Sequence, residues 1–449
     1  MRTHTSPRRR RSAALATLST LILVAAALAA PHARAQKSIN GTERDRALSM
    51  LKVVREDIKK NYYDVTYRGV DVDARFREAE EQMKSATSVG HAFRIIAQAV
   101  IDLGDSHTYF MPPGRAARYD YGWDMMMVGE ACYVHAVRPK SDADAKGLRP
   151  GDRLLKVGGI DVTRDDLWKI KYLFYTLDPQ PGLRLVVQSP GQQPRQVDVM
   201  TKVEARRRTT DLTDETSWFE LEREAENLRK TTRQRFHEEG DLFIWRMPHF
   251  EIDEGKIDQI MSRARKYKAM ILDLRGNYGG PTVALQRLVG NFFDREIKIA
   301  DLKGRKELKP LMSKPRGADA YKGELVVLVD SMSASAAEVF ARVVQLEKRG
   351  TVVGDRTAGA VMVSRFYDHK AGADVVYFFG TSVTYADLIM ADGRSLEYVG
   401  VTPDEPALMT GEEMAAGRDP VLARAAKRLG LDLKPDKAGA LFPYEWPNN

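Results

Sequence analysis

Apolar residues recur at every third or fourth position in three segments near the beginning of the chain, over residues 42–61, 73–84 and 88–103. This spacing places them on one face of an α-helix. The pattern predicts a small helical domain. Its last helix ends at Gly104, and the prolines Pro112 and Pro113 follow.

From about residue 119 to residue 203 the pattern changes to short apolar runs separated by turns. Strands are predicted over residues 125–128, 132–137, 153–157 and 183–188. A densely charged stretch follows, and its segment 216–239 has apolar residues at helical spacing. We expect that segment to be a solvated linker helix.

Residues 241–406 alternate between the two kinds of pattern. Strands are predicted over 242–247, 269–275, 325–329 and 351–354, and helices over 254–268, 283–293 and directly after residue 335. Such alternation predicts a sheet with helices packed on it, and sites form in the loops that leave the carboxyl ends of its strands. Residues 407–449 form a C-terminal extension to which we assign no role.

Residues 325–340 combine an apolar strand, small hydroxyl residues and the start of a helix. This order puts Ser335 at a helix N-terminus, where free N–H groups and the helix dipole stabilise an oxyanion. A serine there is a nucleophile if a base lies nearby. Because Glu338 follows three positions later, the same string also fits a capping box. The local sequence therefore leaves a helix cap and a nucleophile open.

His107 is a candidate base. It lies in the string Gly104-Asp105-Ser106-His107-Thr108, on a tight connection at the end of the helical domain and not on an apolar helix face. Loop histidines with hydroxyl and acidic neighbours are functional more often than average. The loop alone is equally compatible with a structural histidine.

The net charge of +8 and the pI near 9.2 do not indicate nucleic-acid binding, because residues 8–11 are four arginines that supply part of the excess. The remaining basic residues are dispersed without a basic stripe interleaved with aromatic residues. The four arginines, the apolar run 13–30 and Ala33-Arg34-Ala35 predict a secretory signal peptide over residues 1–35. An uncleaved membrane anchor is the alternative.

One cysteine, Cys132, precludes an internal disulfide, and its predicted strand position favours a buried structural residue. A secreted protein without disulfides fits a bacterial periplasm. No later stretch is long and apolar enough to cross a membrane. The mature protein is therefore expected in the periplasm or outside the cell, without a stable membrane span.

Metal and nucleotide chemistry have little support. The histidines are scattered, and neither a His-Glu-x-x-His motif nor a cysteine pair occurs. The glycine-rich loop that ends in Gly279-Gly280 lacks the spacing of phosphate-binding motifs, although its glycines allow another chain to approach bare N–H groups. We expect no metal and no cofactor, and the residues define no oligomeric state.

An ordered set of motifs resembles the tail-specific, or C-terminal processing, serine peptidase family. The motifs are Leu103-Gly104-Asp105-Ser106-His107-Thr108, Asp273-Leu274-Arg275-Gly276-Asn277-Tyr278-Gly279-Gly280, Ser333-Ala334-Ser335-Ala336-Ala337-Glu338-Val339-Phe340, Val353-Gly354-Asp355-Arg356-Thr357 and Asp392-Gly393-Arg394-Ser395-Leu396-Glu397-Tyr398-Val399-Gly400-Val401-Thr402-Pro403-Asp404. The resemblance spans roughly residues 47–404. It implies an α+β multidomain protein with an N-terminal helical domain over 36–115, a β-rich domain over 119–203, a linker over 204–240 and an α/β, crotonase-like ββα peptidase core over 241–406.

Residues 143–162 resemble the PDZ module through Ala143, Gly147-Leu148 and Gly151-Asp152. The resemblance implies that residues 119–203 dock an extended peptide by strand addition. A β-sandwich spacer is the alternative.

The family resemblance assigns roles to particular residues. It makes Ser335 the nucleophile and the N–H groups of Gly280 and Ala336 the oxyanion hole. The Ser–Lys branch of the family has its lysine base at the position of Ala360, which cannot accept a proton.

The branch that resembles the tricorn core peptidase has a Ser-His pair and a glutamate, which match Ser106, His107 and Glu397. This match implies that His107 is the general base and that Glu397, acting through Ser106, fixes the imidazole tautomer.

Two functions follow from these residues. One is a secreted or periplasmic serine endopeptidase that hydrolyses peptide or protein substrates by a Ser-His-Glu acyl-enzyme mechanism. The other is a catalytically inactive peptide- or ligand-binding protein on the same scaffold, since the missing lysine leaves less redundancy in the site.

Overall fold

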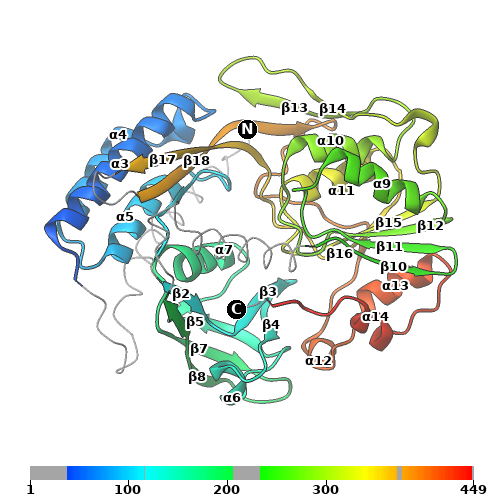
Figure 1. Ribbon diagram of the computed structural model, residues 1–449, viewed down its shortest axis with the longest axis horizontal. Coiled ribbons are helices and arrows are strands. Elements are labelled where there is room, and N and C mark those ends of the chain that lie inside the picture. Colours follow the sequence, from blue (N-terminus) through cyan, green and yellow to red (C-terminus); the bar gives the residue numbers. More distant parts are fainter. Residues whose placement is uncertain (1–37, 116, 206–232, 372–376, 447–449) are drawn as a thin grey trace, which may run out of the picture.

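The computed structural model describes residues 38–115, 117–205, 233–371 and 377–446. The predicted signal peptide and most of the predicted linker helix lie outside the described residues. The described part combines helices and sheets, as predicted (Figure 1). None of its helices has both the length and the apolar character that a membrane crossing requires.

Three helices at the start of the described chain pack together and confirm the predicted helical segments. They are α3 (Gly41–Asn61), α4 (Val72–Lys84) and α5 (Val89–Ile101). Side chains of Asn40, Asp71 and Ser88 each accept a backbone N–H of the first turn, which sets where the three helices begin. Their apolar faces form one buried cluster. A single turn of 3₁₀ helix, Tyr67–Gly69, lies between the first two helices.

The strand-rich unit, residues 117–205, contains an antiparallel sheet in the order β3-β4-β5-β7-β8, with β6 paired to β5. Its strands are β3 (Trp123–Val128), β4 (Ala131–Val137), β5 (Arg153–Val157), β6 (Ile160–Asp161), β7 (Gly182–Gln188) and β8 (Arg195–Met200). All four predicted strands are confirmed, and Cys132 is buried. The outer strands β2 (Ala117–Asp120) and β9 (Lys202–Ala205) pair with each other. The helical elements of the unit are α6 (Asp142–Ala145), α7 (Leu167–Lys171) and the π-helical turn Tyr172–Leu177.

A central sheet organises the second half of the chain, in the order β10-β11-β12-β15-β16-β19. Its members are β10 (Arg235–Glu239), β11 (Leu242–Arg246), β12 (Ala269–Asp273), β15 (Glu324–Val329), β16 (Thr351–Gly354) and β19 (Glu405–Pro406). All pairs are parallel except β10 with β11. The strands predicted in this region are confirmed. The predicted linker helix is wrong at its C-terminal end, because residues 235–239 pair with β11 as a strand.

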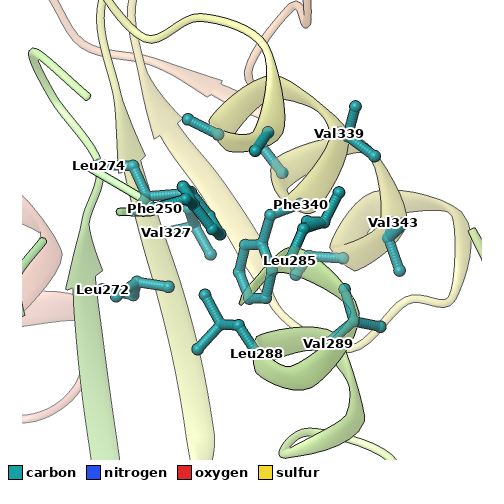
Figure 2. Packing of buried hydrophobic residues seen from close by; sticks show 14 of the residues in the cluster. Phe250, Leu272, Leu274, Leu285, Leu288, Val289, Val327, Val339, Phe340 and Val343 are labelled. Carbon is teal, nitrogen blue, oxygen red and sulfur yellow. The ribbon is translucent and has the colours of Figure 1, made fainter. Parts of the chain in front are cut away.

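Three helices cover one face of the central sheet: α9 (Glu254–Ala264), α10 (Thr282–Gly290) and α11 (Ala336–Leu346). Figure 2 shows the apolar layer between them and the sheet, where Phe340 of α11 lies beside Leu285 and Leu288 of α10. This layer holds the start of α11 in place at the carboxyl ends of the strands.

The C-terminal residues cover the other face of the central sheet. Leu422 of α13 (Pro420–Arg428) and Ala438 of α14 (Pro435–Leu441) share a buried cluster with Ile271 of β12. The short helix α12 (Gly411–Ala415) precedes them. Residues 407–449, to which the sequence analysis assigned no role, therefore include helices that cover the second face of the central sheet. A parallel sheet is normally covered on both faces.

A long antiparallel hairpin, β17 (Met362–Ala371) and β18 (Tyr377–Met390), was not predicted from the sequence. One part of β18 pairs with β1 (Tyr109–Met111), and another part pairs with β13 (Lys298–Gly304), which continues the sheet to β14 (Leu311–Met312). A 3₁₀ turn, Gly317–Asp319, precedes β15. The strand β1 begins two residues after His107 and pairs with β18, and Leu388 of β18 lies in the same buried cluster as the central sheet. The hairpin therefore joins the end of the helical segment to the central sheet.

Candidate active site

The loop that carries His107 joins α5 to β1, and one buried carboxylate holds it. Asp105 is only 3% exposed. Its Oδ1 accepts hydrogen bonds from the N–H groups of His107 at 3.0 Å and Thr108 at 2.8 Å, and from the hydroxyl of Thr384 at 2.6 Å. Thr384 belongs to β18, so the His107 loop is attached to the hairpin through a side chain as well as through β1.

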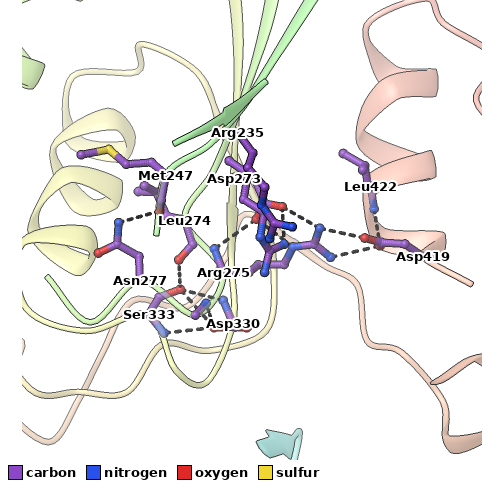
Figure 3. A network of polar contacts seen from close by, with 12 residues as sticks. Arg235, Met247, Asp273, Leu274, Arg275, Asn277, Asp330, Ser333, Asp419 and Leu422 are labelled. Atoms are coloured by element: carbon purple, nitrogen blue, oxygen red, sulfur yellow. Dashed lines mark hydrogen bonds and ion pairs between the residues drawn. The ribbon is translucent and has the colours of Figure 1, made fainter. Parts of the chain in front are cut away.

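Ser335 lies in a strained turn between β15 and α11. Its φ of 56° and ψ of −120° are a combination that glycine adopts far more easily than serine. Asp330 Oδ1 accepts the N–H groups of Gly276 at 2.9 Å and Ser333 at 3.0 Å, and the Ser333 hydroxyl donates to the carbonyl of Leu274 at 2.8 Å (Figure 3). These bonds tie the turn to the glycine-rich loop and hold the strained backbone, a feature typical of nucleophile turns.

A second buried carboxylate, Glu338, holds the backbone around Ser335. It is fully buried in the first turn of α11. It accepts the N–H groups of Ser335 at 3.0 Å, Gly359 at 2.8 Å and Ala360 at 2.9 Å, and the hydroxyl of Thr357 at 2.5 Å. Burial raises the pKa of Glu338 to about 7, against the lowering effect of these four bonds. The capping contact predicted between Glu338 and Ser335 is thus present.

Four side chains form a continuous chain of hydrogen bonds that ends at Ser335. The Ser335 Oγ lies 3.3 Å from Nε2 of His107, and Nδ1 of His107 lies 2.7 Å from the hydroxyl oxygen of Ser106. That hydroxyl donates to Oε2 of Glu397 at 2.9 Å. Glu397 also accepts the N–H groups of Ser106 at 2.7 Å and Val361 at 2.8 Å.

The direction of these bonds determines what the imidazole can do. When Glu397 is ionised, the Ser106 hydroxyl donates to it and accepts from Nδ1–H of His107. The lone pair of Nε2 then faces the Ser335 hydroxyl. This is the tautomer that a general base needs.

Burial affects the two ionisable groups of this chain in opposite directions. It lowers the pKa of His107, an effect that the nearby Asp105 charge partly offsets. It raises the pKa of Glu397 to about 7, against the hydrogen bonds from Val361 and Ser106. The imidazole is therefore mostly neutral at pH 7, while Glu397 changes its charge close to neutrality.

The glycine-rich loop lies directly against the start of α11. A Cβ added to Gly279 would be 2.6 Å from the Cβ of Ser335 and 3.0 Å from the backbone N of Ala336, so only glycine permits this approach. Ala336 is the first residue of α11, and the N–H groups of a first helical turn have no partner within the helix. Gly280, which follows Gly279, is thereby brought to the same corner as Ser335 and Ala336.

An ion cluster supports the glycine-rich loop from the opposite side. Arg275 donates to both carboxylate oxygens of Asp273, each at 2.8 Å, and to both of Asp419, at 3.0 and 2.8 Å (Figure 3). Although burial opposes ionisation, Arg275 and Arg246 lower the pKa of Asp273 to about 2. Because Asp419 also caps α13 through the N–H of Leu422, the cluster joins the loop to the C-terminal helices.

A groove of about 470 Å³ opens beside Ser106. It runs between β1 and the helical part of the strand-rich unit. Its lining includes the aromatic residues Tyr109, Trp168, Tyr172 and Tyr175. It is also lined by Lys171 and Asp124. These two residues form an ion pair, with 3.0 Å between Nζ and Oδ1. An apolar wall with a few polar groups is typical of a ligand site.

Residues 243–407, which span the central sheet and its loops, match the model described as peptidase family S41. This segment of the chain is therefore similar in sequence to peptidase family S41. Ser335 and Gly280 fall inside the matched residues, as does Glu397, whereas Ser106 and His107 lie outside them.

Proteins named as carboxyl-terminal-processing peptidases and tricorn protease homologs are similar to this chain over most of its length. The carboxyl-terminal-processing peptidase 1 of Arabidopsis thaliana chloroplasts is 25% identical over 351 residues, which are 72% of this chain and 64% of that protein. The tricorn protease homolog 2 of Streptomyces coelicolor is 27% identical over 402 residues, which are 84% of this chain and 31% of that protein. The chain thus spans less than two thirds of the length of these relatives.

A solved structure shares the fold. The photosystem II D1 C-terminal processing protease superposes with a TM-score of 0.51 at 19% identity, over 88% of this chain and 99% of that one. The mixed α and β architecture of the described residues therefore resembles the fold of that protease.

Sequence reasoning missed two residues of this candidate site. Asp105 was quoted within a motif but received no role, and the signal for it was an acidic residue two positions before a loop histidine. Thr384 carried no signal, because its bond to Asp105 depends on the hairpin that the sequence did not predict. Within the described residues, no group of three or more histidine, cysteine or acidic side chains is arranged to hold a metal ion.

Proposed function

We propose that this chain is a secreted serine endopeptidase in which Ser335 is the nucleophile, His107 the general base and Glu397 the group that orients it through Ser106. The observation that carries the proposal is the 3.3 Å contact between Ser335 Oγ and His107 Nε2, at the end of a hydrogen-bonded chain that begins at Glu397. A nucleophile, a base and an orienting carboxylate in this order define the triad arrangement of acyl transfer.

The proposed reaction has two halves. The Ser335 hydroxyl loses its proton to Nε2 of His107 while its oxygen attacks the carbonyl carbon of a peptide bond. The resulting oxyanion accepts hydrogen bonds from the N–H groups of Gly280 and Ala336. His107 then donates the proton to the leaving amine. A water molecule, deprotonated by His107, hydrolyses the acyl-enzyme and restores the Ser335 hydroxyl.

The proposal extends to the other parts of the chain. The antiparallel sheet of the strand-rich unit and its PDZ-like string at residues 143–162 support a role in docking peptide substrates. The central sheet and its helices would be the crotonase-like peptidase core over residues 241–406. Residues 1–35 support export to the periplasm or beyond, by the charge and hydropathy pattern of a signal peptide.

A fluorophosphonate probe tests the proposal directly, since it reacts with an activated serine. We expect the probe to label Ser335 in the full chain, with loss of label in Ser335→Ala and at least a hundredfold slower labelling in His107→Ala. His237→Ala is the matched control, because His237 lies on β10, contacts Glu239 and should leave labelling unchanged.

Cleavage of a fluorogenic casein substrate should follow the same order among these variants. Probe attached to another residue, or casein cleavage that survives in Ser335→Ala, would overturn the assignment of the nucleophile. Labelling of His107→Ala at the wild-type rate would show that the base is another group.

A further inference from the structure

The last described residues, Phe442–Trp446, leave α14 and run to the strand-rich unit without helix or strand pairing of their own. In Figure 1 the C-terminal end lies beside β3 and β4, far from the C-terminal helices in which the segment begins. We call Phe442–Trp446 the tail segment.

The tail segment contacts the edge of the central sheet through Phe442, Pro443 and Glu445. The guanidinium of Arg235, on β10, donates to the carbonyl of Pro443 at 2.8 Å and lies 5.5 Å from the ring centre of Phe442. The carboxylate of Glu445 is 2.7 Å from Arg233 and 3.6 Å from Arg235. Two cations thus face Glu445, the acidic residue between Tyr444 and Trp446.

The tail segment also contacts the strand-rich unit, through Tyr444 and Trp446 on either side of Glu445. The Tyr444 hydroxyl donates to Oδ2 of Asp124 on β3 at 3.3 Å, and its ring meets the His135 ring edge-on, with the centres 5.4 Å apart. The guanidinium of Arg138 lies 4.7 Å from the ring centre of Trp446. The tail segment therefore connects two units that have separate sheets.

Asp124 links the tail segment to the groove beside Ser106. One of its carboxylate oxygens bonds to Tyr444 and the other to Lys171, and both Asp124 and Lys171 line the groove. Since Ser106 also lines it, the groove extends from the hydrogen-bonded chain of the site to the place where Tyr444 docks. Tyr444 thus contacts a side chain that lines the groove.

The contacts of the tail segment are mostly polar and partly exposed, as in a bound ligand, and are not the close apolar packing of a protein core. Tyr444 remains 42% exposed, and its contacts are a hydrogen bond and an edge-on ring contact. Of the cations that face Glu445, Arg233 is exposed and Arg235 is partly buried. Ion pairs and cation–π contacts near a surface are individually weak. The covalent connection to α14 adds to these contacts a high local concentration of the segment at its docking surface.

We propose that the tail segment is a displaceable internal ligand, and that its docking surface, formed by Asp124, His135, Arg138 and Arg235, binds peptides that have an acidic residue between two aromatic residues. The sequence Tyr444-Glu445-Trp446 is the model for such a peptide. The proposal concerns binding and does not depend on cleavage, so it can fail or succeed independently of the proposed peptidase function.

A binding experiment tests it. The probe is a fluorescein-labelled synthetic peptide with the sequence of residues 440–449, and its anisotropy is measured with the full chain and with a chain that ends at Leu441. We expect the truncated chain to bind the peptide at least tenfold more tightly than the full chain, because the tethered copy no longer competes. Peptides with alanine in place of Tyr444 or of Trp446 should bind at least tenfold more weakly.

Variants of the surface complete the test. In the truncated chain Arg138→Met should weaken peptide binding at least fivefold, whereas Arg153→Met, an exposed arginine on β5 of the same unit, should not. Circular dichroism and a melting curve establish that each chain is folded. If the truncated chain does not fold, the full-length variant Trp446→Ala takes its place and should bind the peptide more tightly than the wild-type chain.

Equal binding to both chains, or no binding to a folded chain that lacks the tail segment, would overturn the proposal. The same holds if the Arg153→Met variant weakens binding as much as Arg138→Met does.

Discussion

The substitution Glu397→Gln tests the chain of hydrogen bonds by changing a single atom. Glu397 accepts three hydrogen bonds, two of them from the N–H and hydroxyl groups of Ser106. A glutamine amide can donate as well as accept. It can therefore reverse the Ser106 hydroxyl, which would then donate to Nδ1 of His107 and leave Nε2–H facing Ser335. That is the wrong tautomer for a base.

Two magnitudes follow from the structure. Loss of the correct tautomer and of the charge near the imidazolium should lower the plateau of kcat/KM by on the order of 10²–10⁴. In the wild-type chain, the pKa of Glu397 is raised to about 7, so the active, ionised form prevails above that pH and is lost below it. Activity at pH 6 should then be roughly one tenth of the plateau.

The assay is kcat/KM for a fluorogenic peptide from pH 5 to pH 9, in buffers of constant ionic strength. In Glu397→Gln the acid midpoint should move from about 7 to below the ordinary histidine value, since burial lowers the pKa of His107, which becomes the remaining titrating group. A midpoint that stays near pH 7 in the variant would refute the role of Glu397. A plateau within threefold of wild type would refute the relay through Ser106.

Three further predictions concern the residues that hold the site. The variant Ser335→Gly should be more stable than Ser335→Ala by about 1 kcal/mol in urea unfolding, because glycine relieves the strained φ and ψ; equal midpoints would contradict this. Asp105→Asn keeps the accepting oxygen but removes the charge that raises the pKa values of His107 and Glu397, so the acid limb of kcat/KM should move to lower pH. Asp105→Ala should instead lower the plateau, and identical profiles for the two variants would argue against a positioning role. For Glu338, a pKa raised from 4.5 to about 7 means that the proton is held more tightly in the folded chain, so its stabilising contribution is lost as the pH rises through 7. Relative to Glu338→Gln, the wild-type chain should thus lose about 2–3 kcal/mol of stability between pH 5 and pH 8 by thermal unfolding, and a constant difference would exclude this titration.

Much of the secondary structure could be predicted because it depends on neighbouring residues. The helix α3 begins where the Asn40 side chain accepts the N–H of Glu43, and its apolar positions lie on one face. The strand β12 is a continuous apolar run, as expected for a parallel strand buried on both sides. The start of α11 at Ser335 is likewise a local property of small hydroxyl residues before an apolar helix.

The errors have a different origin. Residues 235–239 carry the charged pattern of a helix, but pairing with the apolar strand β11 overrides that preference. The strand β17 pairs with β18 along its length, and β18 also pairs with β1 and β13, which are distant in the sequence. The register of the hairpin is therefore set jointly by all three partners of β18. No local pattern encodes such a register.

The sequence by itself indicated which side chains are candidates for the chemistry, and it determined which short segments are helices or strands, because both signals depend on residues within a few positions of one another. Only the tertiary structure decided that His107 meets Ser335 across 228 positions and that Ser106 meets Glu397 across 291. These encounters, together with the two-sided covering of the central sheet and the docked tail segment, depend on how distant apolar faces pack. That packing is a property of the whole folded chain.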